Sequence, residues 1–213
     1  MHYRLLLIYF ALITSVLSSQ WRFQSDGPLS MQTVDGETIR EYKDNVIIKN
    51  DNMTLITDKA TQYTKRDEIL LEGSVRMLSD TDTLICDRMY YWSKNDSALA
   101  SGYVQLENKT QKITSDEITY IVTNGPFGFS FISNGNTVIR DSIRTISGNY
   151  ISYDDRNQRM NIKIDAKVIE SDKGISGDAM SILFAEKTLE TILVEGKSSA
   201  YQNIYTKSKT NID

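Results

Sequence analysis

Apolar and polar residues alternate along most of this chain in short runs, and clusters of polar residues separate the runs. The alternation is clear at Val75 and Met77, and again at Val104 and Leu106. A period of two over a few residues is typical of a strand with one buried face. Clusters rich in Asn, Asp and Ser, such as residues 79–82, predict hairpin turns between the strands. The pattern therefore predicts an all-β fold of short antiparallel strands.

The runs recur with a period of about 29–34 residues. Three copies are in register, each with a valine at its head and an aspartate twelve residues later: Val46 and Asp58, Val75 and Asp87, Val104 and Asp116. Two looser copies are headed by Val138 and Val168, with Gly148 and Asp178 ten residues on, and a sixth begins at Glu195–Gly196. Such a period indicates one supersecondary unit stacked on copies of itself, so that neighbours bury a continuous apolar face.

Within each repeat we expect about four short strand segments in antiparallel succession. Only residues 178–190 have enough Ala, Met, Leu and Glu to favour a helix. The repeat places Met180 at the position of Ala60 and Met89, so we expect a strand here as well, because tertiary context overrides local propensity.

An insertion at residues 124–131 separates the third repeat from the fourth. The simpler interpretation is a longer loop whose aromatic residues pack on the edge of the sheet. The alternative is a loop that shapes the opening of an apolar cavity, because loops on rigid scaffolds often carry function.

The N-terminus differs in composition from the rest of the chain. Arg4 precedes an apolar run at residues 5–17, and the small residues Ser18 and Ser19 follow it. A run of this length is short for a membrane span but normal for a secretory signal. We therefore expect a signal peptide, or alternatively a membrane anchor, at 1–19. A lead-in segment at 20–40 and a single domain at 41–213 complete the predicted organisation, with the domain outside the inner membrane.

Composition and single residues exclude several functions. A net charge of −4 and a pI near 5.2 argue against nucleic acid, whose binding proteins usually carry a basic stripe. The only histidine, His2, lies in the signal segment, so histidine-based catalysis and histidine-ligated metal are not expected. The only cysteine, Cys86, holds the repeat position of Thr57 and Ser115, which indicates a small core residue rather than a nucleophile. We expect no enzyme and no cofactor.

The acidic residues have two interpretations. The recurring Asp58, Asp87, Asp116 and Asp178 could form a ladder of metal ligands, but the glycine-rich nonapeptides of calcium-binding β-rolls are absent. A structural role is favoured, in which each carboxylate accepts backbone N–H groups at a bend. The clusters at 80–82 and 154–155 are expected to be solvated turns.

The remaining candidate site is an apolar stripe. Its residues recur at equivalent positions of successive repeats: Val46, Ile48, Leu55, Leu71, Val75, Met77, Leu84, Val104, Leu106 and Ile113. The stripe is either an ordinary sandwich core or a long trough between two sheet faces. A trough lined by such residues suits acyl chains, and each methylene that enters it gains about 0.8 kcal/mol.

These repeats resemble a known family. The segments at 70–75, 99–104 and 193–196 are similar to the recurring Leu-x-Gly-x-Val motif of the OstA-like family. The phrases around Asp58, Asp87 and Asp116, each followed by a tyrosine, are similar as well. The family includes the lipopolysaccharide transport proteins LptA and LptC and the N-terminal domain of LptD. The resemblance covers about residues 35–205.

The resemblance implies an open antiparallel β-jellyroll, folded like a taco, whose interior holds the acyl chains of lipopolysaccharide. It also implies a periplasmic protein that joins other jellyroll proteins, or copies of itself, by edge-strand pairing into a bridge to the outer membrane. We expect the early edge near residues 39–48 and the late edge near 192–205. Two alternatives are an inner-membrane-anchored component of the LptC type and a structural β-solenoid that binds no lipid.

Overall fold

The computed structural model describes residues 21–123, 129–185 and 188–202. Along these residues the strands are β1 (Arg22–Gln24), β2 (Ser30–Val34), β3 (Glu37–Lys49), β4 (Met53–Tyr63), β5 (Glu68–Ser79), β6 (Asp82–Trp92), β7 (Ser97–Asn108), β8 (Lys112–Val122), β9 (Phe129–Arg140), β10 (Arg144–Asp154), β11 (Arg159–Glu170), β12 (Lys173–Ala185), β13 (Thr188–Glu195) and β14 (Ser199–Gln202). They form one antiparallel sheet, which confirms the predicted all-β class. Within these ranges, no helix is long and apolar enough to cross a membrane. The predicted signal or anchor at 1–19 lies outside the described residues.

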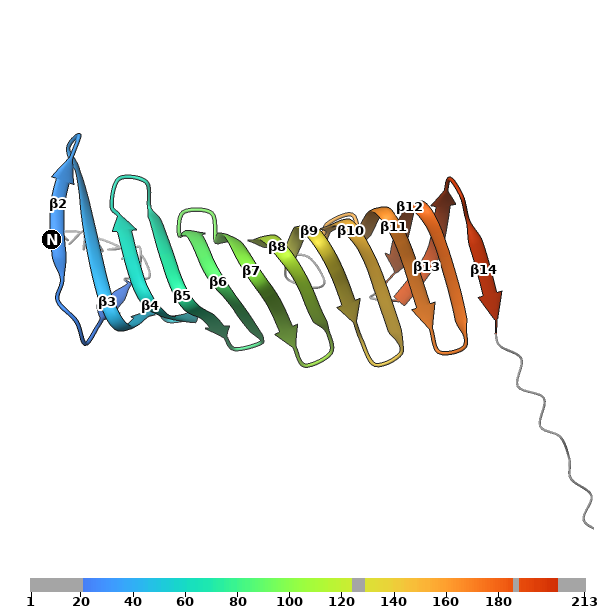
Figure 1. Ribbon diagram of the computed structural model, residues 1–213, viewed down its shortest axis with the longest axis horizontal. Coiled ribbons are helices and arrows are strands. Elements are labelled where there is room, and N and C mark those ends of the chain that lie inside the picture. The colour runs from blue at the N-terminus through green and yellow to red at the C-terminus, as the bar shows by residue number, and fades with distance from the viewer. Residues whose placement is uncertain (1–20, 124–128, 186–187, 203–213) are drawn as a thin grey trace, which may run out of the picture.

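From β3 to β13, strands that are neighbours in the sequence are also neighbours in the sheet (Figure 1). At the N-terminal end, β1 and β2 both pair with β3, at opposite halves of that strand. At the C-terminal end, β13 and β14 likewise pair with opposite halves of β12. The sheet therefore extends along one axis and has an edge at each end.

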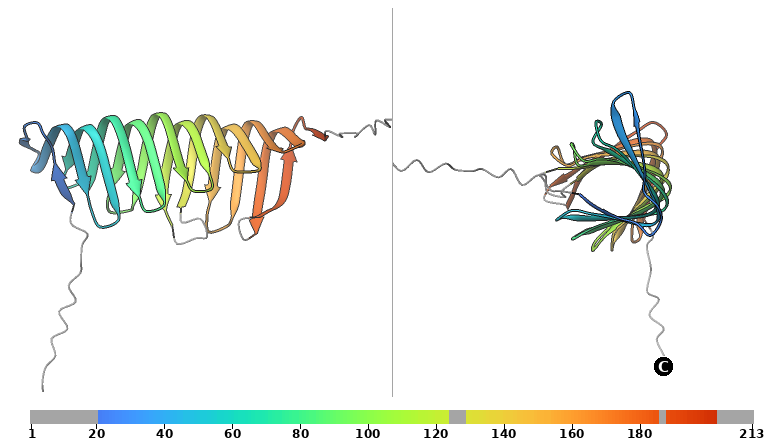
Figure 2. Two further views of the ribbon diagram at one scale, coloured as in Figure 1. Left: turned by 90° about the horizontal axis from the view of Figure 1, so that it is seen from below. Right: turned by 90° about the vertical axis from the view of Figure 1, so that its left-hand side faces the viewer.

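Each long strand bends near its middle, so that the single sheet folds into two facing walls that are open along one side (Figure 2). The bend is visible in the pairing, because every ladder from β3 to β12 shifts register near the middle of its strands. We call the wall that contains β1 and β14 the first wall, and the wall that contains β2 and β13 the second wall. This is the open antiparallel jellyroll that the family resemblance implies.

At four bends, a glycine contacts an aspartate on the preceding strand. Gly102 in β7 has a φ of 78°, a left-handed conformation that glycine adopts without steric cost. A Cβ at Gly102 would collide with the carboxylate of Asp87 on the preceding strand. The same contact recurs at Gly73, Gly135 and Gly196. At the last of these bends, Asp178 Oδ2 accepts a hydrogen bond from the backbone N–H of Lys197 at 3.0 Å. Asp178 therefore has the structural role that the sequence favours, whereas Asp116 Oδ2 accepts from the side-chain amide of Asn136 at 3.0 Å. For Asp58 and Asp87, hydrogen bonds to backbone N–H groups stay a prediction.

The strand register corrects the alignment of the fourth repeat. Thr137 pairs with Gly148 as Val104 pairs with Ser115, so Thr137 is the head of this repeat and Val138 is not. Val138 lies on the outer face of the sheet, next to the buried Thr137. The prediction was wrong because it required an apolar residue at a position that a threonine fills.

The same correction restores the spacing of the later repeats. Asn149, rather than Gly148, takes the place of the bend aspartate and accepts a hydrogen bond from the backbone N–H of Asn136 at 3.3 Å. Ala166 replaces Val168 as the head of the fifth repeat, because Ala166 pairs with Gly177 at the bend. Twelve residues then separate head from bend residue in all five repeats, including Thr137 to Asn149 and Ala166 to Asp178.

The four short segments expected in each repeat are the halves of two long, bent strands. In the second repeat, for example, β5 and β6 each contribute one half to each wall. The competition between helix and strand at 178–190 is resolved as predicted, since the described part of this segment lies in β12 and β13.

The N-terminal edge differs from the expectation. Residues 39–48 lie in β3, which is covered on one side by β4 and on the other by β1 and β2. Between β1 and β2, the N–H groups of Asp26 and Gly27 donate to the bend of β3, at 2.9 Å each. Residues 22–34 therefore form the edge row, and the sheet extends closer to the N-terminus than the expected boundary at residue 41. The C-terminal edge is formed by β13 and β14; β14 lies within the range 192–205 predicted for this edge, whereas β13 begins four residues before it.

Candidate functional site

A continuous row of apolar side chains runs along the inner face of the first wall. Each residue of the row is the Cα partner of the next on the neighbouring strand: Phe23, Ile48, Leu55, Met77, Leu84, Leu106, Ile113, Ile139, Ile146, Val168, Ile175 and Ala200. The row crosses the whole sheet without a polar residue. Burying one such leucine or isoleucine stabilises the fold by about 1.5–3 kcal/mol, so the row is a main source of stability.

All ten residues predicted to line a trough are buried, with exposed fractions of 3% or less. Ile48, Leu55, Met77, Leu84, Leu106 and Ile113 belong to the first-wall row, Leu71 lies on the second wall, and Val46, Val75 and Val104 lie beside the bend. The structure thus brings all ten into one interior. Their contact with a lipid stays a prediction.

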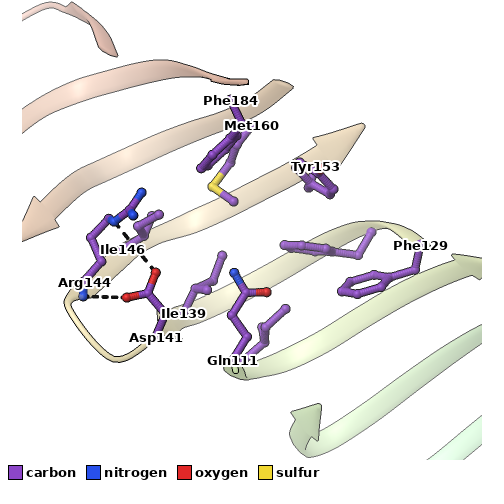
Figure 3. Close-up of a pocket in the computed structure, with 11 residues that line it drawn as sticks. Gln111, Phe129, Ile139, Asp141, Arg144, Ile146, Tyr153, Met160 and Phe184 are labelled. Carbon is purple, nitrogen blue, oxygen red and sulfur yellow. Dashed lines mark hydrogen bonds and ion pairs between the residues drawn. The ribbon is translucent and has the colours of Figure 1, made fainter. Parts of the chain in front are cut away.

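The interior opens into a cavity between the two walls at β8–β12. Its lining is Gln111, Ile113, Phe129, Phe131, Ile139, Asp141, Arg144, Ile146, Tyr153, Met160 and Phe184 (Figure 3). Of the ten predicted trough residues, only Ile113 is part of this lining. The cavity measures about 50 Å³. That volume holds a few water molecules, but it is far below the ~300–1,000 Å³ of a site for a drug-sized ligand.

Aromatic side chains form the second-wall side of the cavity. Tyr120, Phe129, Phe131, Tyr153 and Phe184 contact one another in sequence, with ring centroids 5.2–6.2 Å apart. Phe129 and Phe131 belong to the insertion but lie in β9, so its described part is a strand rather than the predicted loop. Both side chains line the cavity, which agrees with the second interpretation in that respect only. Residues 124–128 of the insertion lie outside the described part of the chain.

At the N-terminal end, residues of the lead-in segment fill the interior instead. Phe23 stacks on Tyr42 with ring centroids 4.8 Å apart, and Trp21 meets the ring of Tyr91 edge-on at 5.4 Å. Trp21 precedes β1 in the first wall, whereas Tyr91 lies on the second, so this contact joins the two walls. The sequence did not assign these two aromatic residues to the interior, because they precede the first repeat.

A charged pair lies at the first-wall rim of the cavity, in the hairpin between β9 and β10. Asp141 Oδ1 accepts hydrogen bonds from the backbone N–H groups of Ile143 and Arg144, at 2.9 and 2.7 Å. Asp141 Oδ2 forms an ion pair with Arg144 Nε at 3.7 Å. The Arg144 side chain is only 11% exposed. Sequence reasoning missed this pair.

The comparisons with known proteins agree with this geometry. The model of the OstA-like protein family matches residues 24–178. The chain belongs to the OstA-like family. Among solved structures, LptH from Pseudomonas aeruginosa, described as the LptA homologous periplasmic component of the conserved lipopolysaccharide transport device, matches with a TM-score of 0.50 and 14% identity. The match covers 58% of this chain and 95% of LptH and, at that identity, shows a shared fold. No curated protein matches the chain.

One acidic residue of this OstA-like protein does not lie in the solvated turn that the sequence predicts. Asp154 is exposed, as a solvated turn requires, but Asp155 is fully buried. Its carboxylate accepts hydrogen bonds from Tyr153 Oη at 3.2 Å and from Thr123 Oγ1, and its backbone N–H donates to Ser130 Oγ at 3.0 Å. Asp155 therefore joins the end of β10 to both sides of the insertion. The prediction of a solvated turn was wrong because two of these partners, Thr123 and Ser130, are distant in sequence.

Cys86 occupies the bend position that its repeat partners predict. In the equivalent place, Ser115 Oγ lies 3.0–3.1 Å from the carbonyls of Glu117, Asn134 and Gly135. Cys86 Sγ likewise donates to the carbonyl of Arg88 at 3.2 Å. The position therefore requires a small side chain that can donate to the carbonyls of the bend.

In the folded protein, the Cys86 thiol is expected to be inert toward a water-soluble disulfide reagent at about pH 8. Burial raises the pKa of Cys86 to about 12, so almost none of the reactive thiolate is present. In guanidinium chloride the pKa returns to about 8.5, and the thiol should react rapidly. The absorbance of the released thiolate measures both rates. Equal rates in buffer and in denaturant would contradict the buried position.

Proposed function

We propose that this OstA-like protein binds the acyl chains of lipopolysaccharide between its two walls and takes part in their transport across the periplasm. The proposal is supported by the family of the chain and by the fold that it shares with LptH, a periplasmic component of a lipopolysaccharide transport device. The chemistry of the interior fits a binding role, because its row of aliphatic side chains offers no nucleophile or base.

The observation that carries the proposal is the unbroken apolar row of the first wall, which faces aromatic residues across a cavity. Acyl chains are linear and apolar, and a row that crosses twelve strands offers them one continuous surface. Each methylene that leaves water for this surface gains about 0.8 kcal/mol. The ten predicted trough residues are candidates for this contact, with Ile113 placed to make it first.

The small volume of the cavity adds a step to the proposal. At about 50 Å³, the cavity does not hold a full acyl chain, so the walls or their rim side chains must separate on binding. Separation is easier at β8–β12, where the cavity already exists, than near β1, where Trp21 joins the two walls. We therefore propose that the chain enters at the C-terminal half of the interior.

A photo-crosslinking amino acid tests this proposal. Placed at Phe131, which is 3% exposed and lines the cavity, it is expected to capture lipopolysaccharide in cells that export the protein. The neighbouring Ile132 is the matched control, because it is 41% exposed on the outer face of the same strand. Lipopolysaccharide should be detected by immunoblot at position 131 only. Equal capture at both positions, or none at 131, would favour the structural solenoid that binds no lipid.

The transport role also requires contact with other proteins. We propose that the sheet edges at β1 and β2 and at β13 and β14 pair with other jellyroll proteins or with copies of this chain, since an edge presents unpaired N–H and C=O groups. The location proposed is the periplasm, with the segment at 1–19 acting as a cleaved signal or, in the alternative of the LptC type, as an anchor in the inner membrane.

A further inference from the structure

The Arg144 guanidinium at the rim of the cavity is paired with Asp141, but its hydrogen bonding is incomplete. Arg144 Nε is buried and has no hydrogen-bond partner among the described residues. Its ion-pair distance of 3.7 Å to Asp141 Oδ2 is too long for a hydrogen bond. Glu170 is the Cα partner of Arg144 on β11, but no ion pair within 4.0 Å joins the two side chains. A guanidinium N–H that loses water without gaining an acceptor raises the free energy of the folded state.

The turn itself does not explain this arginine. Asp141 caps the hairpin through Oδ1, and Asn50, Ser79 and Asn108 cap the equivalent hairpins in the same way. The residues three positions after those caps are Met53, Asp82 and Gln111, so the position of Arg144 has no requirement for a cation. Lys173 holds the corresponding rim position in the next hairpin but is exposed.

Apolar side chains lie next to the charged guanidinium of Arg144 at the rim of the cavity. Ile139 and Ile146 of the first wall and Met160 of the second line the same cavity and are apolar (Figure 3). A guanidinium offers a planar set of N–H donors that matches the oxygens of a phosphate or carboxylate. An amphiphile with an anionic group next to its chain would satisfy both: the chain would contact the isoleucines, and the anion would accept the unpaired N–H.

We propose that Arg144 is a subsite for the anionic headgroup, phosphate or carboxylate, of an acyl amphiphile whose chain lies in the adjacent cavity. The inference rests on the proposed function, because it assigns the orientation of a ligand within the same interior. Asp141 keeps the empty site neutral and, since Oδ1 is fixed by the turn, the ligand displaces only the long contact to Oδ2.

The test compares decyl phosphate with decanol, which has the same chain without the phosphate, by calorimetric titration of the purified chain. Decyl phosphate is expected to bind about tenfold tighter or more, as a charge-assisted hydrogen bond implies. Arg144→Gln should remove most of this difference and leave decanol binding unchanged, and Arg144→Lys should keep part of it. Arg140→Gln is the matched control, because Arg140 is exposed on the outer face of the same hairpin. Circular dichroism confirms that each variant is folded, and the comparison of the two ligands on the unmodified chain needs no variant.

The outcomes separate the two proposals. If neither ligand binds the unmodified chain, the lipid-binding function fails, and this subsite fails with it. If both ligands bind equally well, or if Arg140→Gln loses as much as Arg144→Gln, the function stands and the subsite is refuted. Inorganic phosphate is titrated alone as a third probe. Binding as tight as that of decyl phosphate would show a site for free anions and overturn the assignment to a headgroup.

Discussion

Replacing Gly102 with alanine is expected to lower the free energy of unfolding by about 2–4 kcal/mol, a large part of the ~5–15 kcal/mol available to a domain. Two causes add. A residue with a Cβ is strained at a φ of 78°, by about 1–2 kcal/mol. The new Cβ would also collide with the side chain of Asp87, whose Cβ and Cγ would lie 2.8 and 2.9 Å away and whose carboxylate oxygen would be closer still. Chemical denaturation followed by circular dichroism measures the change.

Tyr103 provides the control for this substitution. It follows Gly102, also has a positive φ, of 47°, and is 91% exposed. Tyr103→Ala should therefore stay within about 0.5 kcal/mol of the unmodified chain. The double variant Gly102→Ala with Asp87→Ala separates the two causes, because it removes the collision but keeps the strained φ. If the double variant regains part of the lost free energy of unfolding, that part is due to the collision. A Gly102→Ala variant as stable as the unmodified chain would mean that β7 does not bend at this glycine.

The first three repeats could be predicted because their bends depend on local residue chemistry. In the second and third repeats a glycine stands two residues before the apolar head, and in all three repeats an aspartate follows the head by twelve residues, so the pattern is visible in one sequence. The later repeats use other residues for the same geometry. The bend of β11 has Ile164 and Asp165 at positive φ, where no glycine marks it. Such conformations are imposed by the neighbouring strands, so the sequence alone gave no signal for them.

The candidate site was predictable in its chemistry but not in its location. The ten trough residues are all interior because alternation identifies the buried face of a strand. Where the two walls leave space depends on side chains that meet across the fold, such as Trp21 against Tyr91. The pair of Asp141 and Arg144 could have been found by aligning the hairpin caps, since Asn50, Ser79 and Asn108 mark the equivalent turns.

The two edges of the sheet are arranged so that a second copy can continue the fold. Residues 22–34 pass from the first wall, where β1 lies, to the second wall, where β2 lies. Residues 188–202 pass from the second wall, where β13 lies, to the first wall, where β14 lies. These rows are at opposite ends of the molecule (Figure 1). If one copy stacks on the next, β13 meets β2 and β14 meets β1, each in antiparallel orientation. The inner apolar row would then pass from Ala200 of one copy to Phe23 of the next.

The geometry of β2 identifies a substitution that tests this stacking. The backbone N–H of Thr64 donates to the carbonyl of Thr38 at 3.3 Å, so that carbonyl points away from β2. Thr33, the Cα partner of Thr38, is therefore in a pair without mutual hydrogen bonds, and its own N–H points outward from the edge. A proline at this position removes an outward donor without removing a hydrogen bond between β2 and β3.

The unmodified chain is expected to form oligomers whose size increases with concentration, because head-to-tail pairing of two different edges does not close. Thr33→Pro should weaken this association by about tenfold or more, since it removes one interchain hydrogen bond and places the proline ring against the incoming strand. Thr33→Ala keeps the N–H and should associate like the unmodified chain. Light scattering over a concentration series measures association, and circular dichroism shows whether the sheet is intact.

If Thr33→Ala disrupts association as much as Thr33→Pro, a side-chain contact rather than main-chain pairing holds the copies together. If the unmodified chain is monomeric at every concentration, copies of this chain do not stack, and the edges can serve only other jellyroll partners.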